Sequence, residues 1–545
     1  KITICFYIKY EFKMSIIGKK TLVNLNTLLI LLFPFALVSG PLIPEIFLFI
    51  IVVSFFYFVL SEKKTFYFNN NFAKIFLLFF LIINISSFYN FNFISLKSSL
   101  FYFRFGFFAL AVFFFLNINK KLIPLMFLSM TILILILLFD SSIQFFLGKN
   151  LLGFEKNISG RISSFFGDEL VLGSFVSKFF LFYLVLFYSN KFSENKIYLL
   201  LIIFTFFLII FYAASRTSLA SFILSLLFFL FLLKDTKLIL KLLFLFTLSI
   251  FILSQFNNDN YKRIFEHTKY QMFDEYSSFN FLSQRHILHL VTAYNMFKEN
   301  KIIGVGPKSF RILCDDKKYI PYQYIHESNR VVAKDDGILE ISIKSIAYDS
   351  TGKVYEKKYN ADSILSINNL IKTKNNNFKN LSQQDILRIF HGKKSTISEN
   401  KAKLIYQDGS HQNINFVNAI YYIKINEKKF KKGQEILKFR PWYENGCNTH
   451  PHNFLIQILS ETGLVGFIIY IFVGLYFMLG VTNFLFGKKI IKKIYKYKID
   501  FKICLIFISY LVFFFPIFPS GNFFNNWLSM IIYFLMGFLL NFIHK

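Results

Sequence analysis

The sequence predicts an all-α, polytopic membrane protein with about twelve transmembrane helices and a large outer segment that contains a small β-rich insert. Two observations predict this class. The composition is 55% hydrophobic and 20% aromatic, with 79 Phe among 545 residues, which is too much apolar surface for an ordinary soluble protein. In addition, apolar runs of about 17 to 25 residues with few charges recur along the chain, and a helix of that length spans a bilayer.

The apolar runs form two groups, one on each side of the outer segment. The first comprises 21–39, 43–60, 72–89, 98–117, 121–140, 170–189, 196–213, 216–233 and 237–254. The second comprises 463–486, 500–518 and 523–543. Residues 1–20 precede the first run and include Met14, a candidate translation start. Because the first run is long and lacks the small-residue cleavage site of a signal peptide, we expect it to be retained as a helix.

Much of the formal net charge of +30 lies in short loops between the apolar runs. Every second loop carries lysines: Lys63, Lys64, Lys120, Lys121, Lys191, Lys196, Lys234, Lys237 and the cluster from Lys488 to Lys498. A twelve-helix topology places all of these on one side, and lysine-rich short loops remain cytoplasmic. We therefore expect cytoplasmic N- and C-termini. Retention and anionic lipid headgroups account for these lysines without nucleic acid as a partner.

The same topology places residues 141–169 and 255–462 outside. Eight of the nine histidines lie in the second of these segments, from His267 to His452. We divide it into a helical part at 255–326, the β-rich insert at 327–441, and a loop and helix at 442–462. Cys314 and Cys447 bracket the insert, so we expect a disulfide in an oxidising exterior; two free thiols are the alternative, because the sequence alone does not show the geometry.

Local patterns support this division. The stretch "SQRHILHLVTAYNMFKEN" at 283–300 has apolar residues at helical spacing, which predicts an amphipathic helix. The following "GVGPKSF" resembles part of a dinucleotide fingerprint, but no strand precedes it and a third glycine is missing, so a turn is expected. In "AKLIYQDGSHQNINF", Asp408 and Gly409 separate two alternating runs, which predicts a β-hairpin.

Four arginines lie at or near the ends of the apolar runs, where a charge is costly and therefore informative. Arg161 and Arg216 follow small polar residues at turns on the predicted outer side. A guanidinium presents a planar fork of donors that suits phosphate oxygens, so both are candidate anion ligands. For Arg104 and Arg285 we expect the simpler role of an interfacial anchor or a partner for a nearby carboxylate.

The stretch "CNTHPHNFLIQILSETGLVG" at 447–466 carries two histidines before an apolar run. Pro451 suits the first turn of a helix, which we expect to continue from His452 to Thr462. A polar stripe follows along this helix at Asn453, Gln457, Ser460 and Glu461. An imidazole there is a candidate proton acceptor near neutral pH. The rival interpretation is a zinc site of His286, His289, His450 and His452, which we disfavour because HExxH is absent.

The residues from His452 to Gly466 resemble the signature H-[NSQ]-x9-G-x-x-G of the O-antigen ligase and polymerase superfamily. Further resemblances follow in family order: "GRISSFFGDELVLGSF", "ASRTSLA", "QRHILHLVTAYNMFKENKIIGVGPKSFR" and "FPIFPSGNFFNN". The chain departs from the family at the β-rich insert, where a shorter loop is usual. This departure leaves the acceptor open.

The resemblance implies glycan transfer from a polyprenyl pyrophosphate to an acceptor hydroxyl, commonly on lipid A-core, at the periplasmic face of the bacterial inner membrane. On this model His452 is the base, and Arg216 and Arg161 bind the pyrophosphate. Asn453, Arg285, His450 and Glu461 are possible supporting residues. The resemblance implies inversion at the anomeric carbon, no nucleotide and no metal cofactor.

Two other classes of function are alternatives to an enzyme. A lipid-linked glycan transporter would be expected to show internal repeats and charges at mid-span, whereas the ionisable residues gather at one face. A receptor that binds glycan through the insert leaves His452 and the arginines unexplained. Within the enzyme class, a polymerase of O-antigen or exopolysaccharide remains the alternative to a ligase, because the two differ only in the acceptor.

Overall fold

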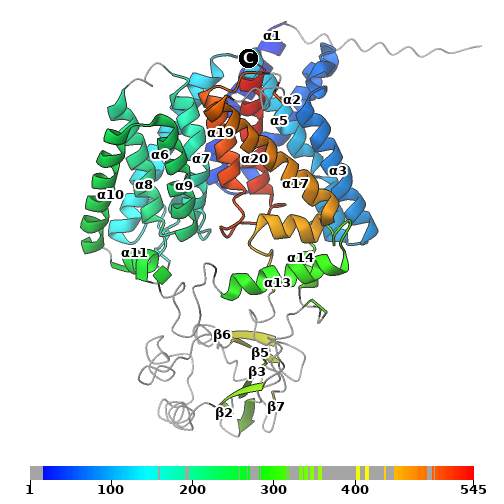
Figure 1. The fold of residues 1–545 in the computed structure, drawn as a ribbon, viewed down its shortest axis with the longest axis vertical. Helices are drawn as coiled ribbons and strands as arrows, with labels where there is room; N and C mark the ends of the chain where they lie inside the picture. The colour runs from blue at the N-terminus through cyan, green and yellow to red at the C-terminus, as the bar shows by residue number, and fades with distance from the viewer. Residues whose placement is uncertain are drawn as a thin grey trace, which may run out of the picture.

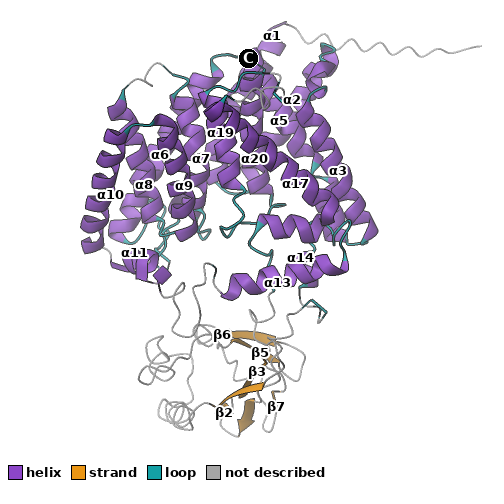
Figure 2. Cartoon of the chain, viewed as in Figure 1, coloured by secondary structure: helices purple, strands orange, loops and turns teal. Residues whose placement is uncertain are grey.

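The computed structural model shows a layer of long helices with shorter helices at one end (Figures 1 and 2). It describes residues 16–544 except 158–159, 191–194, 257, 267, 270–281, 283, 315, 317, 320–330, 488–493 and 496, and between 331 and 446 it describes the strands alone. Helices account for most of the described chain, as the composition predicts.

The first half of the layer is built from ten helices that follow one another closely. They are α1 (Ile16–Val38), α2 (Leu42–Ser61), α3 (Asn71–Tyr89), α4 (Phe93–Leu100), α5 (Phe103–Ile118), α6 (Leu122–Leu147), α7 (Leu172–Phe187), α8 (Lys196–Tyr212), α9 (Arg216–Leu233) and α10 (Thr236–Phe256). Two short 3-10 turns, η1 (Thr65–Phe68) and η2 (Ser164–Phe166), lie between them.

The outer segment and the C-terminal helices follow. They comprise α11 (Asn258–Tyr261), the π-turn η4 (Lys262–Glu266), α13 (Gln284–Glu299), α14 (Phe310–Leu313), α17 (Phe454–Phe486), α19 (Phe501–Phe513) and α20 (Asn526–Ile543). In Figure 1, α11, α13 and α14 lie at one end of the layer, and the C-terminus lies at the other.

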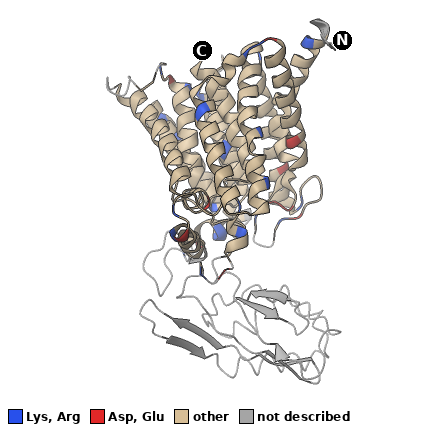
Figure 3. Ribbon diagram, turned by 90° about the vertical axis from the view of Figure 1, so that its right-hand side faces the viewer, with Lys and Arg blue, Asp and Glu red and all other residues tan. Residues whose placement is uncertain are grey.

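Within the described residues, nine helices are long and apolar enough to cross a membrane, and α7, α8 and α19 are shorter apolar helices. A helix therefore occupies every one of the apolar runs, while the number of twelve crossings stays a prediction. Figure 3 shows that charged residues are sparse along these helices.

Side chains cap many of the helices at their first turn. The capping side chain accepts a hydrogen bond from a backbone N–H group of the helix that follows, and it belongs to Asn70, Asn92, Asn195, Asn453, Asp500 or Asn525. Such capping replaces hydration of the free N–H groups at a helix end. The many asparagines next to apolar runs therefore mark where the helices begin.

The core of the layer is aromatic and is centred on α5 and α20. The Phe33 ring lies 4.8 Å from that of Phe108 and 5.1 Å from that of Phe534, within the range of favourable aromatic pairs. Gly537 of α20 sits so close to Val112 of α5 that an added Cβ would lie 2.6 Å from the valine side chain. Small residues at such contacts let membrane helices approach closely.

The lysine-bearing loops that the structure describes lie at one end, as the topology predicts. Lys19 and Lys64 both pair with Glu62, and Lys196 pairs with Asp235 across two loops. In Figure 1 the start of α1 and the C-terminus lie at this same end. Which end faces the cytoplasm stays a prediction.

Arg104 has the simple role expected for it. Its guanidinium donates two hydrogen bonds to the Glu45 carboxylate, at 3.1 Å from Nε and 2.9 Å from Nη2, and a third to the Phe101 carbonyl. This bidentate pair joins α2 to α5, so Arg104 is the partner of a nearby carboxylate.

In the predicted insert the structure describes seven short strands: β1 (Val331–Lys334), β2 (Gly337–Ile341), β3 (Lys344–Tyr348), β4 (Val354–Lys358), β5 (Lys401–Ile405), β6 (His411–Asn415) and β7 (Glu435–Ile436). β1 pairs antiparallel with β2 and β7, β3 with β4, and β5 with β6. The β5–β6 pair flanks Asp408 and Gly409, where the sequence predicts a hairpin. The remainder of 327–441 lies outside the described residues, so the insert as a unit stays a prediction.

A break in α17 joins the outer segment to the membrane helices. Gly463 has φ 65° and ψ −167° inside an otherwise helical segment, a conformation that favours glycine. The break exposes backbone groups, and residues 301–306 satisfy them. Val305 and Gly306 donate to the carbonyls of Ser460 and Glu461 at 3.0 and 2.8 Å.

The same pairing continues in the opposite sense beyond the break. The N–H groups of Leu464 and Val465 donate to the carbonyls of Lys301 and Ile302 at 2.8 and 3.2 Å. Gly304 has φ +69°, and a Cβ there would collide with backbone atoms of α17. The "GVGPKSF" stretch is thus a turn, as predicted, and its first glycine allows two backbones to approach closely.

We predict that Gly463→Ala and Gly304→Ala each destabilise the protein, by about 2 kcal/mol or more, because a side chain is strained at positive φ and has no room against the facing backbone. Gly474→Ala is the matched control, since Gly474 lies in the same helix with nothing within 4 Å of its Cβ position. Thermal unfolding in detergent measures the difference. Equal melting temperatures in all three variants would contradict this account of the break.

Cys314 and Cys447 are joined as a disulfide, with Cα atoms 4.9 Å apart and a sequence separation of 133. They lie beside a small cluster of buried side chains, Ala293, Met296, Val305, Phe310 and Tyr319, that packs α13 and α14 together.

We predict that protein from its native envelope carries this bond, because it lies at the end opposite the lysine-rich loops. Non-reduced peptide mapping by mass spectrometry should recover the linked Cys314 and Cys447 peptides, with Cys504 unlinked because it is buried in α19. Recovery of both thiols in the free state would refute the bond.

Candidate functional site

The two histidines of the 447–453 loop are held by the loop before α20. His450 Nε2 donates to the Ser520 carbonyl at 3.2 Å, and Ser520 N–H donates to the His452 carbonyl at 2.8 Å. His452 has φ 57°, which is uncommon for a residue with a side chain and is concentrated at functional sites.

This geometry corrects the predicted helix start. Pro451 and His452 do not form the first turn; Asn453 caps the helix instead, with its Oδ1 accepting from Ile456 N–H at 3.1 Å. Its side-chain N–H group donates to the Pro516 carbonyl. A cap needs extended backbone, so the helix begins at Phe454 and His452 projects from the loop before it.

Asn448 sets the protonation of His452. The Asn448 Oδ1 accepts from Thr449 N–H at 2.7 Å, so its Nδ2–H faces the His452 Nε2, 2.9 Å away. An amide N–H donates, so Nε2 carries the lone pair and the proton of the neutral ring is on Nδ1. His452 is therefore held in a form that can accept a proton at Nε2.

His450 is held differently. Its Nδ1 lies 2.9 Å from the Thr449 hydroxyl, while its Nε2 donates to Ser520. Burial lowers the pKa of His450 to about 4, outweighing the hydrogen bond to Ser520, which acts in the opposite direction. His450 is thus neutral near pH 7 and ties the two loops together.

Four histidine rings lie together at this point. α13 carries His286 and His289, whose ring centres are 5.3 and 5.4 Å from that of His452, and the His450 ring centre is 4.1 Å from it. The structure therefore assembles the residues of the rival zinc interpretation. Among the described residues, however, no three His, Cys, Asp or Glu side chains are arranged to hold a metal ion.

The polar stripe of α17 faces inward and fixes the loop before α20. Gln457 Nε2 donates to Glu461 at 2.9 Å and to the Asn522 Oδ1 at 2.8 Å, and its Oε1 accepts from Phe523 N–H at 2.9 Å. Glu461 also accepts from Phe310 N–H at 3.1 Å. Glu461 is fully buried, so it links α14 to α17 and has a supporting place behind the histidines.

Arg161 lies in the loop between α6 and α7, which a buried network on α6 holds in place. Asp140 accepts from Leu151 N–H at 3.0 Å and from the Ser164 hydroxyl. Gln144 accepts from Ser164 N–H at 2.7 Å. Arg161 itself donates through Nη2 to the Leu170 carbonyl, while its buried Nε has no hydrogen-bond partner among the described residues.

Arg216 is the first residue of α9, directly after a turn in which Ala214 has φ 46°. The backbone N–H groups of a helix N-terminus favour anions. Burial and the nearby charge of Arg216 lower the pKa of Arg161. The two arginines chosen from the sequence are thus close enough to interact.

Arg263 of η4 joins them and was missed in the sequence. Its Nε donates to the Ala214 carbonyl at 3.1 Å. Burial and the charges of Arg161 and Arg216 lower its pKa to about 10, which still leaves it charged at neutral pH. We call Arg161, Arg216 and Arg263 the arginine cluster. Its members repel one another, and a bound anion would relieve that repulsion.

Lys178 is a second residue that sequence reading passed over. It lies in α7, with its ammonium hydrogen-bonded to Ser174 and 5.2 Å from the centre of the Phe513 ring of α19. A single lysine hardly lowers the mean hydropathy of an apolar run, so it is easily overlooked. A cation within a membrane helix nevertheless marks a candidate functional position.

The arginine cluster and the histidines lie at the same end of the layer (Figure 1), in segments that the start of α20 connects. α7 lies against the start of α9, where a Cβ at Gly173 would be 3.1 Å from Ser215 and Ser218. Trp527 of α20 packs against Phe166 and Phe175, with its ring centre 6.4 and 6.2 Å from theirs. The loop that holds the histidines therefore leads directly onto the elements beside Arg161 and Arg216.

Arg285 lies in the first turn of α13, but its side chain is outside the described residues. Its role stays a prediction.

Residues 200–337 match the family model described as O-antigen ligase. The matched segment contains Arg216, Arg263, the two α13 histidines and the turn at Gly304, whereas Arg161 and His452 lie outside it. No curated protein matches the chain. Together with the apolar helices, the match indicates a multi-pass membrane protein of a glycosyltransferase type, and it confirms the predicted relationship of this chain to the O-antigen ligase superfamily.

Proposed function

We propose that this protein transfers a glycan from a polyprenyl pyrophosphate to an acceptor hydroxyl at the periplasmic face of the bacterial inner membrane. The acceptor that we propose is lipid A-core, which makes the reaction O-antigen ligation in lipopolysaccharide biosynthesis. The observation that carries the proposal is the presence of a proton-accepting imidazole and an arginine cluster at one end of a chain that matches the O-antigen ligase family.

The arginine cluster suits the leaving group. Breaking the bond between the sugar C1 and the phosphate oxygen leaves the electron pair on pyrophosphate. Cations fixed in advance against that oxygen stabilise the transition state. Guanidinium groups offer paired donors for phosphate oxygens, and the start of α9 adds backbone donors.

His452 suits the attacking side. As the acceptor oxygen forms its bond to C1, its proton passes to the His452 Nε2, and the C1–oxygen bond to pyrophosphate breaks. The hydroxyl would replace the Asn448 amide at that lone pair. A single displacement of this kind inverts the anomeric carbon and uses neither a nucleotide nor a metal, because the lipid pyrophosphate is already an activated donor.

A polymerase is the alternative within the same chemistry, with a growing glycan as the acceptor in place of lipid A-core. Deletion of the gene distinguishes the two: a ligase mutant accumulates long lipid-linked glycan, whereas a polymerase mutant accumulates single repeat units. Accumulation of the donor on the cytoplasmic side would instead favour the transporter.

We predict that Arg161→Ala, Arg216→Ala and Arg263→Ala each lower transfer by about a hundredfold or more at unchanged protein levels, because each removes a cation from the leaving group. Lysine at these positions should rescue only in part, since it lacks the bidentate fork. Arg104→Ala is the control, because Arg104 pairs with Glu45 and should affect stability without a specific loss of catalysis. Normal rates in an alanine variant would remove that arginine from the proposed pyrophosphate site.

We predict that His452→Ala abolishes transfer while donor binding is largely retained, and that His450→Ala has a smaller effect through the loop. Wild-type transfer should fall as the pH drops below about 6.5, the ordinary imidazole value. His450 has a pKa of about 4, so its own protonation occurs at a much lower pH than this loss of transfer. The assay measures labelled glycan moved from purified lipid donor to acceptor. Wild-type rates in His452→Ala would overturn the mechanism, and loss of activity with chelator, restored by zinc, would revive the metal interpretation.

Asn448→Asp provides a sharper test of the base. A carboxylate beside Nε2 stabilises the imidazolium, so the acidic limb of the pH–rate profile should move to higher pH, with activity recovered in alkaline buffer. Asn448→Ala should lower the rate without an upward shift. An unmoved limb in Asn448→Asp would contradict proton acceptance by the Nε2 of His452.

A further inference from the structure

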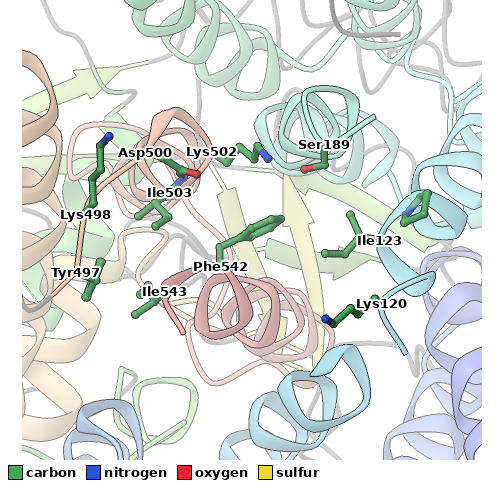
Figure 4. Close-up of a pocket in the computed structure, with 11 residues that line it drawn as sticks. Lys120, Ile123, Ser189, Tyr497, Lys498, Asp500, Lys502, Ile503, Phe542 and Ile543 are labelled. Carbon is green, nitrogen blue, oxygen red and sulfur yellow. The ribbon is translucent and has the colours of Figure 1, made fainter. Parts of the chain in front are cut away.

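We propose that a cavity at the end of the layer opposite the histidines binds the phosphate headgroup of an anionic membrane lipid. The cavity has a volume of about 610 Å³, within the range of small-molecule sites. Figure 4 shows the end of α20 at its centre, with side chains from the α5–α6 turn, the end of α7 and the start of α19 around it.

The charge of the cavity is strongly one-sided. Lys120, Lys498 and Lys502 line it with a single carboxylate, Asp500, which leaves a net charge of +2 (three lysines minus one aspartate). The Asp500 carboxylate accepts from Ile503 N–H at 2.9 Å as a helix cap, so it is already engaged. The site therefore favours an anion.

The three lysines differ from others at the same end of the layer. Lys19, Lys64 and Lys196 form ion pairs with Glu62 or Asp235. In the part of the chain that the structure describes, no carboxylate lies in ion-pair contact with Lys120, Lys498 or Lys502. Cations that line a cavity without such partners are available to a ligand.

The remaining wall is apolar and selects an amphiphile. Ile123, Pro124, Ile503, Phe542 and Ile543 line the cavity beside the lysines, and the Lys502 ammonium lies 6.0 Å from the centre of the Phe542 ring. A free phosphate would leave this surface uncovered, whereas the glycerol and first acyl carbons of a lipid would cover it. Basic pockets between membrane helices are suited to such headgroups.

A bound lipid would join elements that are distant in the sequence. Its phosphate would lie between the α5–α6 turn and the start of α19, and its apolar part would lie against the end of α20. These helices belong to the aromatic core, so occupancy should stabilise the whole layer by mass action. The inference concerns the end of the protein remote from the histidines and does not depend on the proposed transfer.

The test uses the purified full-length protein in detergent, with phosphatidylglycerol, phosphatidylcholine and soluble glycerol 1-phosphate as probes. Native mass spectrometry counts bound lipid, and thermal unfolding measures stabilisation. The key variant is Lys120→Gln with Lys498→Gln and Lys502→Gln. Its matched control removes the same number of charges at the same end, through Lys19→Gln, Lys64→Gln and Lys196→Gln.

We expect phosphatidylglycerol to bind and raise the melting temperature of the wild type and of the control variant. The cavity variant should bind it on the order of a hundredfold more weakly, because each lysine near an anionic headgroup contributes about fivefold. Equal weakening in both variants, or equal binding of phosphatidylcholine, would overturn the site. Binding of glycerol 1-phosphate as tight as that of the lipid would overturn the lipid assignment. Loss of transfer activity has no bearing on these outcomes.

Discussion

The rest of this structure depends on the paired backbone at the break in α17. Opening a helix inside a buried segment exposes carbonyl and N–H groups, which cost free energy unless they find partners. Residues 301–306 supply those partners on both sides of Gly463. The C-terminal end of α3 also supports this pairing: Asn90 donates to the Gly304 carbonyl at 3.0 Å and Ser86 to the Glu461 carbonyl at 3.1 Å. Three distant segments thereby become one rigid unit beneath the histidines.

This constraint gives physical meaning to the spacing between a histidine and two glycines. His452 precedes the helix and Gly463 breaks it. The helical segment between them carries the polar stripe, in which Gln457 fixes the loop before α20 at Asn522 and Phe523. α13 reaches the same point because residues 301–306 follow it directly. The base and its neighbouring rings are thus placed by backbone pairing, while the arginine cluster is placed by the Asp140 network and the turn before α9. The histidines and the arginine cluster are therefore held by separate sets of contacts at the same end of the layer.

The sequence was sufficient to predict most of the helices, because long apolar runs are local signals. It also predicted that Arg161 and Arg216 would act together, because the topology places both turns on the outer side, whereas a group of four histidines was considered only as the disfavoured zinc site. The sequence did not predict features that depend on contacts between residues distant in the chain. Arg263 sits in a weakly patterned stretch and is brought to the cluster by the Ala214 carbonyl. The start of α17 was wrong because Pro451 is a common first-turn residue, whereas Asn453 is the better cap.

We propose that the chain moves a glycan from lipid pyrophosphate to a hydroxyl in one displacement. The most direct measurement is single-turnover transfer with purified protein and a polyprenyl-pyrophosphate glycan of known anomeric configuration, with product stereochemistry read by NMR and released lipid pyrophosphate counted. The account predicts an inverted linkage and one polyprenyl pyrophosphate released for each glycan transferred. Retention of configuration, or donor that crosses the membrane without being cleaved, would contradict it.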